Sequence, residues 1–555
     1  MASLVILAAL LVCASHGSAA LVPRLALDAS PGPSASYPYD PTVLGDDLVF
    51  AATIDRGSEL YATDGSRVRL VKDLVPGEES GDPGDLVRAG GLVYFLGYLP
   101  DFSYELWKTD GQTASQAADP APGPDPSQVS DLTALGDELY FTAQNALTGE
   151  ELWKTDGTTA TMVQDLYPGS DDSDPDNLTP YKGELYFTAD TPATGEELFR
   201  TDGSTISLVA DIEPGASGSS PDELEVMGDH LYLAAYKTGP SRELWRTDGT
   251  TTTLVADIDP GAGYGSPDEL TAAGGRLFFA ADDGVTGDEL YSTDGTTTAR
   301  VADINTGASS SDPEEITAFG DGRVLLQAWD PTHGDEPYVA DATGASRLGD
   351  LQPGDGDSDP EDFTDVDGTA YFSAVGDNIG RELYSTDGNS ASLVGDLLPG
   401  TDGSSPRAFT PFRGATWFTA DDGLHGREFW KLVPPDTTVT VKTPAKLRIG
   451  PGGKAKLKLT CPATEESGPC SGSFALSTRS KVPFRGRKRI VRLAKGSFKV
   501  KAGKSQTLRI KLGNPQRRLL RKVPAARRLR LVAKARDAAG NRATVKLEVK
   551  AVLGR

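Results

Sequence analysis

Two runs of the chain place aspartates at the spacing of carboxylates that can hold a metal ion. They are Asp355, Asp357 and Asp359 in one run, and Asp171, Asp172 and Asp174 in the other. Hard cations such as Ca²⁺ bind several carboxylate and carbonyl oxygens, and alternating aspartates open many calcium loops. The rest of that pattern is missing, because Pro360 stands where a glycine is needed and Val366 where a bidentate glutamate belongs. The six aspartates are therefore candidate calcium ligands, and a solvated acidic rim is the alternative.

The residue types that most enzymes use for nucleophilic or acid–base chemistry are sparse. Beyond His16 the histidines are His230, His333 and His425, and no serine-hydrolase, zinc-protease or phosphate-loop motif occurs. Acid pairs that could hydrolyse a glycosidic bond are available, but among 80 Asp and Glu residues no pair stands out. We expect a protein that is not an enzyme, with a secreted polysaccharide-active enzyme as the alternative.

A segment of the form G-x-E-L-[YW]-x-T-D-G recurs along most of the chain. Its glutamates are Glu59, Glu105, Glu151, Glu197, Glu243, Glu289, Glu336, Glu382 and Glu428. They are 46 residues apart at every step but one, which is 47. A constant period of this length is typical of stacked or circular repeat architectures. Residues present in every repeat are more often architecture than active site, so the motif predicts the fold better than the function.

The fourth repeat shows what each unit contributes. It predicts four short strands, at 177–180, 184–189, 197–201 and 206–212, with alternating or continuous apolar residues. Asp202-Gly203 between the last two strands is a hairpin signal of type I′. Four antiparallel strands per unit, repeated radially, predict a β-propeller with nine blades.

The two ends of the repeat region favour a closed ring over an open solenoid. The ninth repeat runs into Pro434-Pro435 without a fourth strand, and the segment around Arg24–Asp28 matches the fourth strand of the other repeats. We expect this segment to complete the last blade and close the ring, because closure hides an exposed strand edge.

The recurring acids have structural interpretations. We expect the glutamate of each Glu-Leu pair to brace the neighbouring blade. The aspartate that ends each fourth strand, such as Asp211, is expected to accept N–H groups of the following turn. The longer loops all lie on one face of such a ring and are acidic, so this face is the expected functional surface. Blades two and seven depart from the motif, and we expect them to be irregular.

The repeats resemble the ELW-x-x-DGT repeat family of secreted bacterial proteins, whose motif stands in full from Glu151 to Thr158. The resemblance covers all nine units. It implies an extracellular protein built from repeats, with a molecular function that is largely uncharacterised.

The flanking regions predict export and a second domain. Residues 1–20 read as a secretory signal peptide with an apolar run and small residues before the cut. Residues 21–434 are the acidic propeller, and 435–555 are a basic domain with 32 Lys+Arg and 5 Asp+Glu. Cys461 and Cys470 are expected to form a disulfide in an oxidising compartment, with a metal pair as the alternative.

Strict alternation of cationic and aliphatic residues predicts strands in the basic domain, with Asn514–Lys522 as a short helical crossover. The domain resembles the immunoglobulin-like sandwiches at the C-termini of many actinobacterial exported proteins. Its charge predicts binding of polyanions such as an anionic cell-wall polymer or polysaccharide, extracellular DNA or its own propeller. Only Phe474, Phe484 and Phe498 are aromatic, too few to stack nucleic-acid bases specifically.

These observations predict an extracellular or cell-surface binding or adhesion scaffold. The loop face of the propeller would recognise an unknown ligand, and the cationic sandwich would hold the protein on an anionic envelope. No segment after the signal peptide is long enough and apolar enough to cross a membrane. A structural surface protein stabilised by bound calcium is a further alternative, and no other cofactor is expected.

Overall fold

The protein is described from a computed structural model. The residues it describes are 21–31, 34–55, 57–77, 79–98, 104–117, 120, 128–237, 241–260, 263–434, 446–450, 452–460, 470–501, 505–536 and 542–553. The expected signal peptide and Cys461 lie outside these residues, as does the side chain of Cys470, so the signal peptide and the disulfide stay predictions. Two compact units divide the chain, one over Val22–Val433 and one from Pro434 onward.

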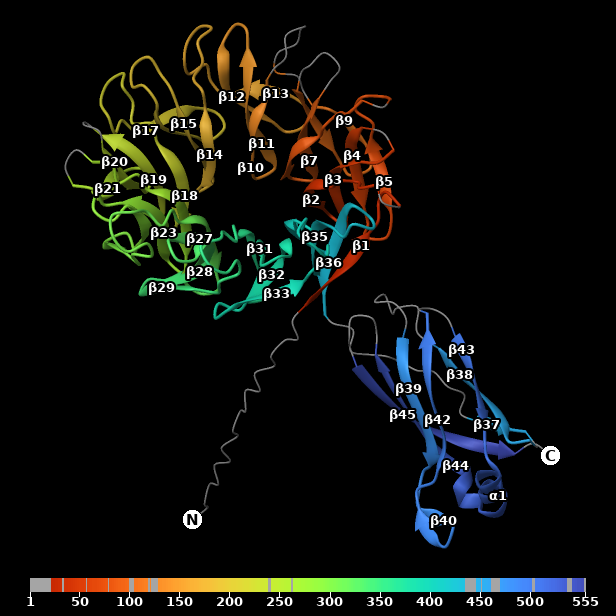
Figure 1. The fold of residues 1–555 in the computed structure, drawn as a ribbon. Coiled ribbons are helices and arrows are strands. Elements are labelled where there is room, and N and C mark those ends of the chain that lie inside the picture. Colours follow the sequence, from red (N-terminus) through yellow and green to blue (C-terminus); the bar gives the residue numbers. More distant parts are fainter. Residues whose placement is uncertain are drawn as a thin grey trace, which may run out of the picture. The chain divides into compact units, whose positions relative to one another are not determined.

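The first unit is a ring of nine four-stranded antiparallel sheets, which confirms the nine-bladed propeller (Figure 1). Each blade is written here from its innermost to its outermost strand. Blades one to three are β2 (Tyr39–Leu44), β3 (Asp47–Thr53), β4 (Ser58–Thr63) and β5 (Val68–Lys72); β6 (Gly84–Ala89), β7 (Leu92–Tyr98), β8 (Tyr104–Thr109) and β9 (Ala114–Gln116); and β10 (Ser130–Leu135), β11 (Glu138–Asn145), β12 (Gly149–Thr155) and β13 (Ala160–Met162).

Blades four to six are β14 (Asp176–Tyr181), β15 (Glu184–Ala189), β16 (Glu197–Thr201) and β17 (Ile206–Ala210); β18 (Asp222–Met227), β19 (His230–Lys237), β20 (Ser241–Thr247) and β21 (Thr252–Ala256); and β22 (Asp268–Ala273), β23 (Arg276–Asp282), β24 (Asp288–Thr293) and β25 (Thr298–Arg300). Blades seven to nine are β26 (Glu314–Phe319), β27 (Arg323–Asp330), β28 (Gly334–Asp341) and β29 (Gly344–Arg347); β30 (Glu361–Val366), β31 (Thr369–Gly376), β32 (Gly380–Thr386) and β33 (Ala391–Gly395); and β34 (Arg407–Phe412), β35 (Ala415–Asp421), β36 (Arg427–Val433) and β1 (Val22–Leu27).

The core of the ring lies between blades. Tyr186 and Leu198 of blade four pack in one cluster with Leu231, Leu233 and Trp245 of blade five, and all five are buried. The middle strands therefore carry bulky residues on both faces, as the sequence predicts for sheets packed between two neighbours. Because each cluster draws on two blades, no blade has a complete core of its own.

The Asp-Gly turn differs in type from the expectation. Only Gly203 has a positive φ, of 87°, whereas a type I′ turn needs two such residues. The Asp202 carboxylate instead accepts the N–H groups of Ser204 and Thr205, at 2.9 and 3.1 Å. The glycine has a second role in the ring: a Cβ on the equivalent Gly249 would stand 2.5 Å from the hydroxyl of Tyr186 in the preceding blade.

The recurring glutamate fastens the loop that leads from one blade to the next, here called the interblade loop. Glu197 accepts hydrogen bonds from the N–H groups of Ile212 and Glu213, at 3.1 and 3.0 Å, and from the Ser219 hydroxyl at 2.5 Å. Ser219 stands just before β18, so the carboxylate holds the entrance to blade five. We call this arrangement the glutamate clamp. It is formed by Glu59, Glu151, Glu197, Glu243, Glu289, Glu336, Glu382 and Glu428, all buried.

The recurring aspartate does not have the expected role. The clamp glutamate, and not the aspartate, accepts the N–H groups of the turn after the fourth strand. Among the described residues, one carboxylate oxygen of Asp28, of Asp165 and of Asp303 is buried without a hydrogen-bond partner. The expectation failed because both side chains are carboxylates near the same turn, and only the structure shows which one the N–H groups face.

The N-terminal segment closes the ring, as predicted. β1 pairs antiparallel with β36, with Val22 opposite Val433 and Leu27 opposite Phe429. Glu428 then accepts the N–H groups of Ala29 and Ser36, both at 2.9 Å, and the Ser36 hydroxyl at 2.7 Å. The chain start thus reproduces the interblade clamp across a sequence separation of about 400 residues.

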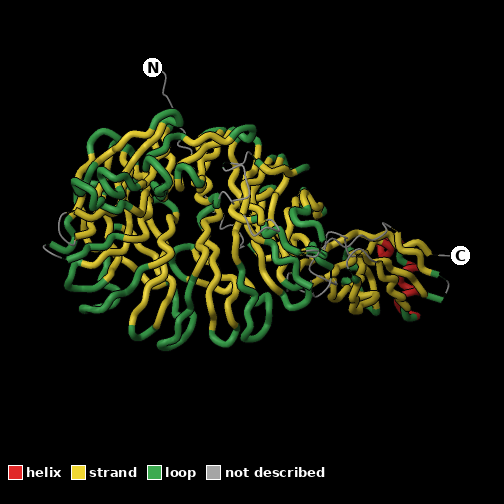
Figure 2. Tube along the Cα trace, turned by 90° about the horizontal axis from the view of Figure 1, so that it is seen from above, coloured by secondary structure: helices red, strands yellow, loops and turns green. Residues whose placement is uncertain are grey.

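The second unit is a single seven-stranded sheet in the order β42-β39-β44-β45-β37-β38-β43. Its strands are β37 (Lys446–Ile449), β38 (Lys454–Thr460), β39 (Cys470–Thr478), β42 (Arg492–Val500), β43 (Ser505–Lys511), β44 (Arg528–Arg536) and β45 (Arg542–Leu553). A hairpin of β40 (Val482–Phe484) and β41 (Arg487–Arg489) is separate. The helix α1 (Asn514–Lys522) coincides with the predicted crossover, followed by the 3-10 helix η1 (Pro524–Arg527); Figure 2 shows this helical region in red in an otherwise β structure.

The sheet of the second unit closes in a barrel-like way, which differs from the two separate layers expected of an immunoglobulin-like sandwich. β45 spans 12 residues and pairs antiparallel with β44 and parallel with β37, so it joins strands that a sandwich would place in different sheets. The end strands β42 and β43 are linked by a hydrogen bond from the Lys499 N–H to the Gln506 side chain. No helix among the described residues is both long and apolar enough to cross a bilayer.

The clamp that closes the ring should be a large single contributor to its stability. Replacing Glu428 by alanine leaves the buried N–H of Ser36 and the partly buried N–H of Ala29 without an acceptor, which costs about 2–4 kcal/mol of unfolding free energy. Urea unfolding followed by tryptophan fluorescence measures the loss. The control is Glu184→Ala, which removes only a partly exposed ion pair with Arg200 and should cost under about 1 kcal/mol. Equal losses in the two variants would contradict the closing role.

Burial raises the pKa of the clamp glutamates, to about 7 for Glu59, against the opposing effect of the N–H groups they accept. The charge of a nearby aspartate, such as Asp73 beside Glu59, raises the pKa further. A raised folded-state pKa means that the folded protein binds more protons than the unfolded chain between pH 4.5 and 7. The stability that this proton uptake contributes is complete below pH 4.5 and is lost as the pH rises through 7.

We therefore expect the unfolding free energy to increase when the pH is lowered from 8 to 5. Glu59→Gln removes one titrating clamp and should reduce the slope of unfolding free energy against pH. Urea titrations at half-unit pH steps measure both slopes. A wild-type protein that loses stability over this range, or a variant with an unchanged slope, would refute the assignment.

Candidate functional site

The candidate site is the end of the ring formed by the interblade loops and by the loops between second and third strands. We call this end the loop face. The antiparallel order of every blade brings these two loop sets together, and it leaves the tight turns at the opposite end. The acidic runs singled out in the sequence lie here.

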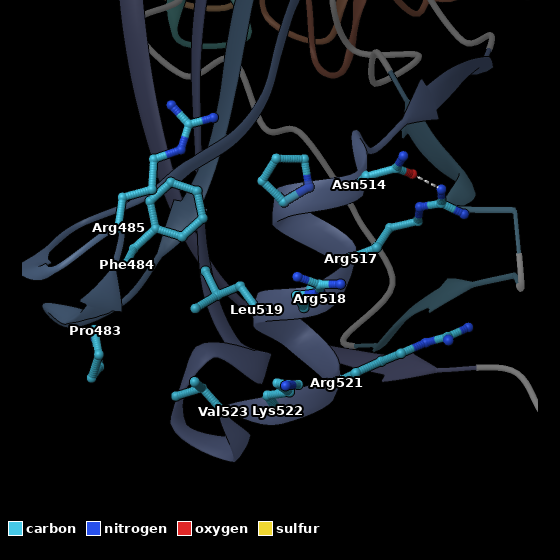
Figure 3. A pocket seen from close by; sticks show the side chains of 11 residues that line it. Pro483, Phe484, Arg485, Asn514, Arg517, Arg518, Leu519, Arg521, Lys522 and Val523 are labelled. Carbon is cyan, nitrogen blue, oxygen red and sulfur yellow. Dashed lines mark hydrogen bonds between the residues drawn. The ribbon is translucent and has the colours of Figure 1, made fainter.

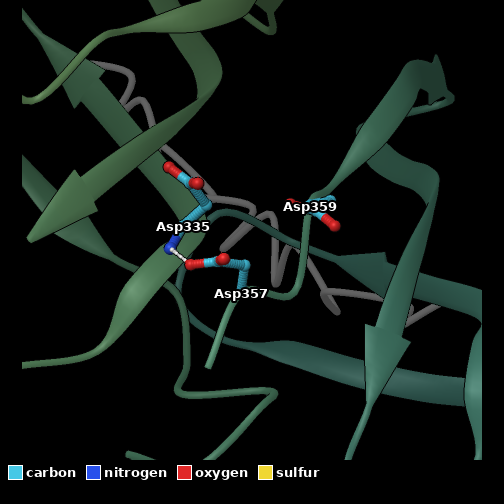
Figure 4. A group of neighbouring side chains, drawn as sticks. All are labelled: Asp335, Asp357 and Asp359. Carbon is cyan, nitrogen blue, oxygen red and sulfur yellow. Dashed lines mark hydrogen bonds between the residues drawn. The ribbon is translucent and has the colours of Figure 1, made fainter. Parts of the chain in front are cut away.

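Asp335, Asp357 and Asp359 form an acidic cluster between blades seven and eight (Figure 4). One carboxylate oxygen of each lies within 4.8 Å of the others, and the Asp335 N–H donates to Asp357 at 3.1 Å. Burial, followed by the charges of Asp357 and Asp359, raises the pKa of Asp335 to about 6. Asp355, predicted as a ligand, is not part of this cluster. The third carboxylate comes instead from β28, where Asp335 precedes the clamp glutamate.

The second predicted run occupies the same repeat positions between blades three and four, although among the described residues only the Asp335 cluster brings three carboxylates within 4.8 Å of one another. The Glu150 N–H donates to Asp172 at 2.8 Å, and burial, with the charges of Asp174 and Asp172 adding to it, raises the pKa of Glu150. Asp174 also has a raised pKa, from burial and from Asp172 and Asp190. Asp171 is exposed and outside the group. In both runs, therefore, two of the three predicted aspartates lie near a third acid that a strand contributes, which is Asp335 in one run and Glu150 in the other.

These clusters belong to three repeat positions that vary around the ring, here called the variable positions. The first precedes the clamp glutamate and holds Ser58, Tyr104, Glu150, Glu196, Arg242, Asp288, Asp335, Arg381 and Arg427. The second precedes the clamp serine or the glycine in its place, which is Gly81 in one blade and Gly265 in another, and its described members are Ala35, Ser80, Asp172, Gly218, Tyr264, Ser310, Asp357 and Gly403. The third follows that serine and holds Tyr37, Asp82, Gln128, Asp174, Ser220, Ser266, Asp312, Asp359 and Ser405.

The backbone at the third variable position is the same in each blade although the side chains differ. All nine residues at the third position have a positive φ, between 36° and 45°. Few non-glycine residues adopt this conformation, so its recurrence shows that the loops share one fixed shape. Sequence reasoning missed the first position because it stands beside an invariant glutamate. The signal that could have found it is its variation between acids, arginines and a tyrosine.

Arginines at the first position neutralise some of the acidic loops. Arg381 lies 3.8 Å from Asp359 and 3.2 Å from Glu361, so it competes for the Asp335 cluster with any bound cation. The next blade has Glu196 at the repeat position of Arg381, so the acids around Asp172 are not neutralised in this way. The two acidic groups therefore differ in charge although their backbones match.

A ring of acids surrounds the axis of the propeller on the same face. The second residue of each innermost strand has a positive φ, and most are acids: Asp40, Asp85, Asp131, Asn177, Glu223, Glu269, Glu315, Asp362 and Ala408. Several carboxylates accept an N–H from the innermost strand of the next blade, as Asp40 does from Asp85 at 3.1 Å. Burial raises the pKa of Glu223 to about 7. The innermost strands of blades nine, one, two and three line a concave space of about 570 Å³ at this ring.

Tyrosines stand at the variable positions where acids are absent. Tyr37, Tyr104 and Tyr264 are 56%, 46% and 48% exposed. Tyr104 packs against Tyr98 with ring centroids 5.2 Å apart, and Tyr264 against Tyr236 at 6.3 Å. The loop face thus carries flat aromatic surfaces between its charged groups.

The histidines do not come together with these groups. His333 and His425 each contact an aspartate three residues earlier in their own loop, Asp330 at 2.9 Å and Asp422 at 2.8 Å. The hydrogen bond with Asp422 raises the pKa of His425. Both histidines therefore stabilise loop turns.

Blade seven, expected to be irregular, has the regular strand order and a complete clamp at Glu336. Blade two also has four strands, with residues 99–103 and 121–127 outside those described.

Calcium binding stays a prediction, and the acidic cluster provides a sharp test of it. Added Ca²⁺ should raise the thermal midpoint of the full chain by a few degrees over EDTA, because a ligand that binds only the folded state stabilises it. Asp357→Asn should abolish the shift, whereas Asp355→Asn, in the same loop but outside the cluster, should preserve it. Differential scanning calorimetry gives the midpoints. No shift in the wild type, or equal effects of the two variants, would exclude a site at this cluster.

No protein-family model and no curated protein matches this chain. Among solved structures it is similar to a prolyl endopeptidase at 12% identity and a TM-score of 0.36, over 78% of this chain and 55% of that one. It is also similar to Sqt1 of Saccharomyces cerevisiae, at 10% identity and a TM-score of 0.34, over 63% of this chain and 94% of that one. The similarity to an ancestral GH74 enzyme has 10% identity and a TM-score of 0.27, over 70% of this chain and 71% of that one. The chain thus spans about half the length of the endopeptidase, and values this low identify no function.

Proposed function

We propose that this protein is an exported, non-enzymatic binding or adhesion scaffold of the ELW-x-x-DGT repeat type. In this proposal the variable positions of the loop face recognise a ligand, and the second unit holds the protein on an anionic surface. The observation that carries the proposal is that each repeat contains positions that recur in every blade and, directly beside them, positions that vary between blades. The eight clamp glutamates all accept hydrogen bonds from their interblade loop, whereas the three variable positions beside them change from blade to blade.

A scaffold of this kind supports recognition because its backbone is fixed before a ligand arrives. The clamps hold the described interblade loops at two or more points, so little conformational entropy remains to be lost on binding. Tyrosine and arginine dominate the binding energy of many interfaces, and both are found at the variable positions. A tyrosine ring offers a flat apolar face beside a hydroxyl group, which suits a sugar ring in a polysaccharide ligand.

The charge of the second unit supports the anchoring role. Its region from Asp436 onward has a net charge of +27, and the rest of the chain has −53. A cationic domain binds polyanions through release of their counterions, which makes the binding weaker at high salt. Retention on an anionic surface should therefore fall steeply as the salt concentration rises.

One observation favours the alternative of a polysaccharide-active enzyme. Asp335 has a pKa of about 6 beside two further carboxylates, which suits a general acid that works near that pH. Against this, a similar acidic group recurs between blades three and four, and repetition is more typical of a scaffold than of an active site.

A glycan array probed with the full chain tests the proposal. We expect binding to a restricted set of oligosaccharides without release of reducing ends. Tyr264→Ala should weaken that binding at least tenfold, as expected for an aromatic anchor. Leu254→Ala is the matched control, because Leu254 is similarly exposed, at 46%, but lies on the outermost strand β21. Cleavage of a bound glycan would favour the enzyme, and equal effects of the two variants would refute recognition by the loop face.

A further inference from the structure

The second unit contains a cationic groove between the β40–β41 hairpin and helix α1 (Figure 3). The groove has a volume of about 850 Å³ and no carboxylate among its lining residues. Its charged side chains are Arg485, Arg517, Arg518, Arg521 and Lys522. We call it the α1 groove. Five cations around one concavity repel one another, so the arrangement gains stability from a bound anion.

The elements that present these cations are firmly held. Leu519 and Leu520 of α1 are buried in the core of the second unit, so the opposite side of the helix faces outward. The Arg527 side chain donates to the Leu520 carbonyl at 2.9 Å near the end of the helix. In the hairpin, Arg485 and Gly486 both have a positive φ, 48° and 76°, which is the tight turn that fits a two-residue loop. Sites on such rigid elements bind without reordering.

The spacing of the cations suits a linear polymer with repeated charges. Arg517 and Arg521, and likewise Arg518 and Lys522, are four residues apart, which places each pair about 6 Å apart along the helix axis. Arg518, Arg521 and Lys522 are exposed, and Arg517 is half-buried and bonded to Asn514. Among the described residues of this unit, the ion pair given by the structure joins Arg479 and Glu548, away from the groove. Among the carboxylates that the structure describes in this unit, none pairs with Arg485, Arg518, Arg521 or Lys522.

The chemistry of the lining favours phosphodiester groups joined by sugar or polyol units. Arginine presents a planar fork that pairs with two oxygens of one phosphate, and four of the five cations are arginines. Pro483, Leu519 and Val523 give the groove apolar surface for the carbon-rich units between the charges. Phe484 is the aromatic residue here, and the guanidinium groups of Arg485 and Arg489 lie over its ring, 5.6 and 5.1 Å from its centroid. Its face is therefore not free to stack a nucleobase.

We propose that the α1 groove is a binding site for a linear, non-nucleic phosphodiester polymer. This inference rests on the proposed anchoring role of the second unit and assigns that role to one place and one ligand class. The proposal is distinguishable from binding by a general cationic surface. If charge alone decided binding, a second basic patch on β38 and β43, lined by Lys456 and Arg509, would bind the polymer equally well.

The test compares two double variants of the full chain that lose the same charge. Arg518→Ala with Arg521→Ala alters the α1 groove, and Lys456→Ala with Arg509→Ala alters the other patch. Binding of a fluorescent glycerol phosphate oligomer is measured by anisotropy at several salt concentrations. We expect the groove variant to bind at least tenfold more weakly, with a salt slope shallower by about 1–2, and the control to change less than threefold. Circular dichroism and the thermal midpoint verify that both variants fold.

Two further probes of equal charge test the ligand class. An oligogalacturonate carries carboxylates, and a single-stranded oligodeoxynucleotide carries phosphodiesters with bases. The proposal expects both to bind more weakly than the glycerol phosphate oligomer. A tighter carboxylate or nucleic-acid ligand overturns the assigned class, and equal losses in the two double variants overturn the groove. If the wild type binds none of the three probes, the proposed anchoring role itself fails.

Discussion

The glutamate clamp is the interaction on which the propeller depends. A blade buries its apolar faces against two neighbours, and it can do so only if the chain enters each new blade at the correct place. The buried carboxylate fixes that entrance by accepting two N–H groups and a hydroxyl or further N–H from the loop. Burying the eight clamp glutamates is costly, and their raised pKa values show the cost. The hydrogen bonds offset it, and they give the ring its regular geometry.

The same clamp explains how a uniform repeat can carry a varied surface. Because the clamp fixes the loop backbone, the residue at the third variable position keeps one conformation whatever its side chain. The third variable position has nearly the same φ with Asp359, Ser405 or Tyr37. Aspartate, glutamine, serine and tyrosine can therefore replace one another at this position without changing the fold. The acidic groups near Asp335 and Asp172 show the result, since their backbones match while their neighbours differ in charge.

Much of the fold could be predicted from the sequence because it is repeated. β15 and β16 have the predicted bounds, and the N-terminal strand was identified from its likeness to the other fourth strands. Which of two nearby side chains makes a given contact could not be predicted from the sequence. Whether the Glu or the Asp of a repeat accepts the turn N–H groups depends on where each carboxylate points, and so does the turn type at Asp202-Gly203. In the second unit, alternation predicts strands such as β44, but it does not say that β45 joins them into one sheet. At the loop face, the aspartate runs were visible, whereas the contribution of Asp335 from a strand depends on tertiary contact.

The pairing of β1 with β36 has a mechanical consequence. Val433, the last residue of the ring, is opposite Val22, and β36 is hydrogen-bonded on both sides, to β1 and to β35. Tension on the linker after Val433 therefore enters the ring along a strand in the interior of a sheet. Such a strand must shear two ladders at once before it yields, whereas an edge strand can be peeled away one bond at a time. A protein tethered through its second unit would transmit tension through a strand of its closing blade that is bonded on both sides.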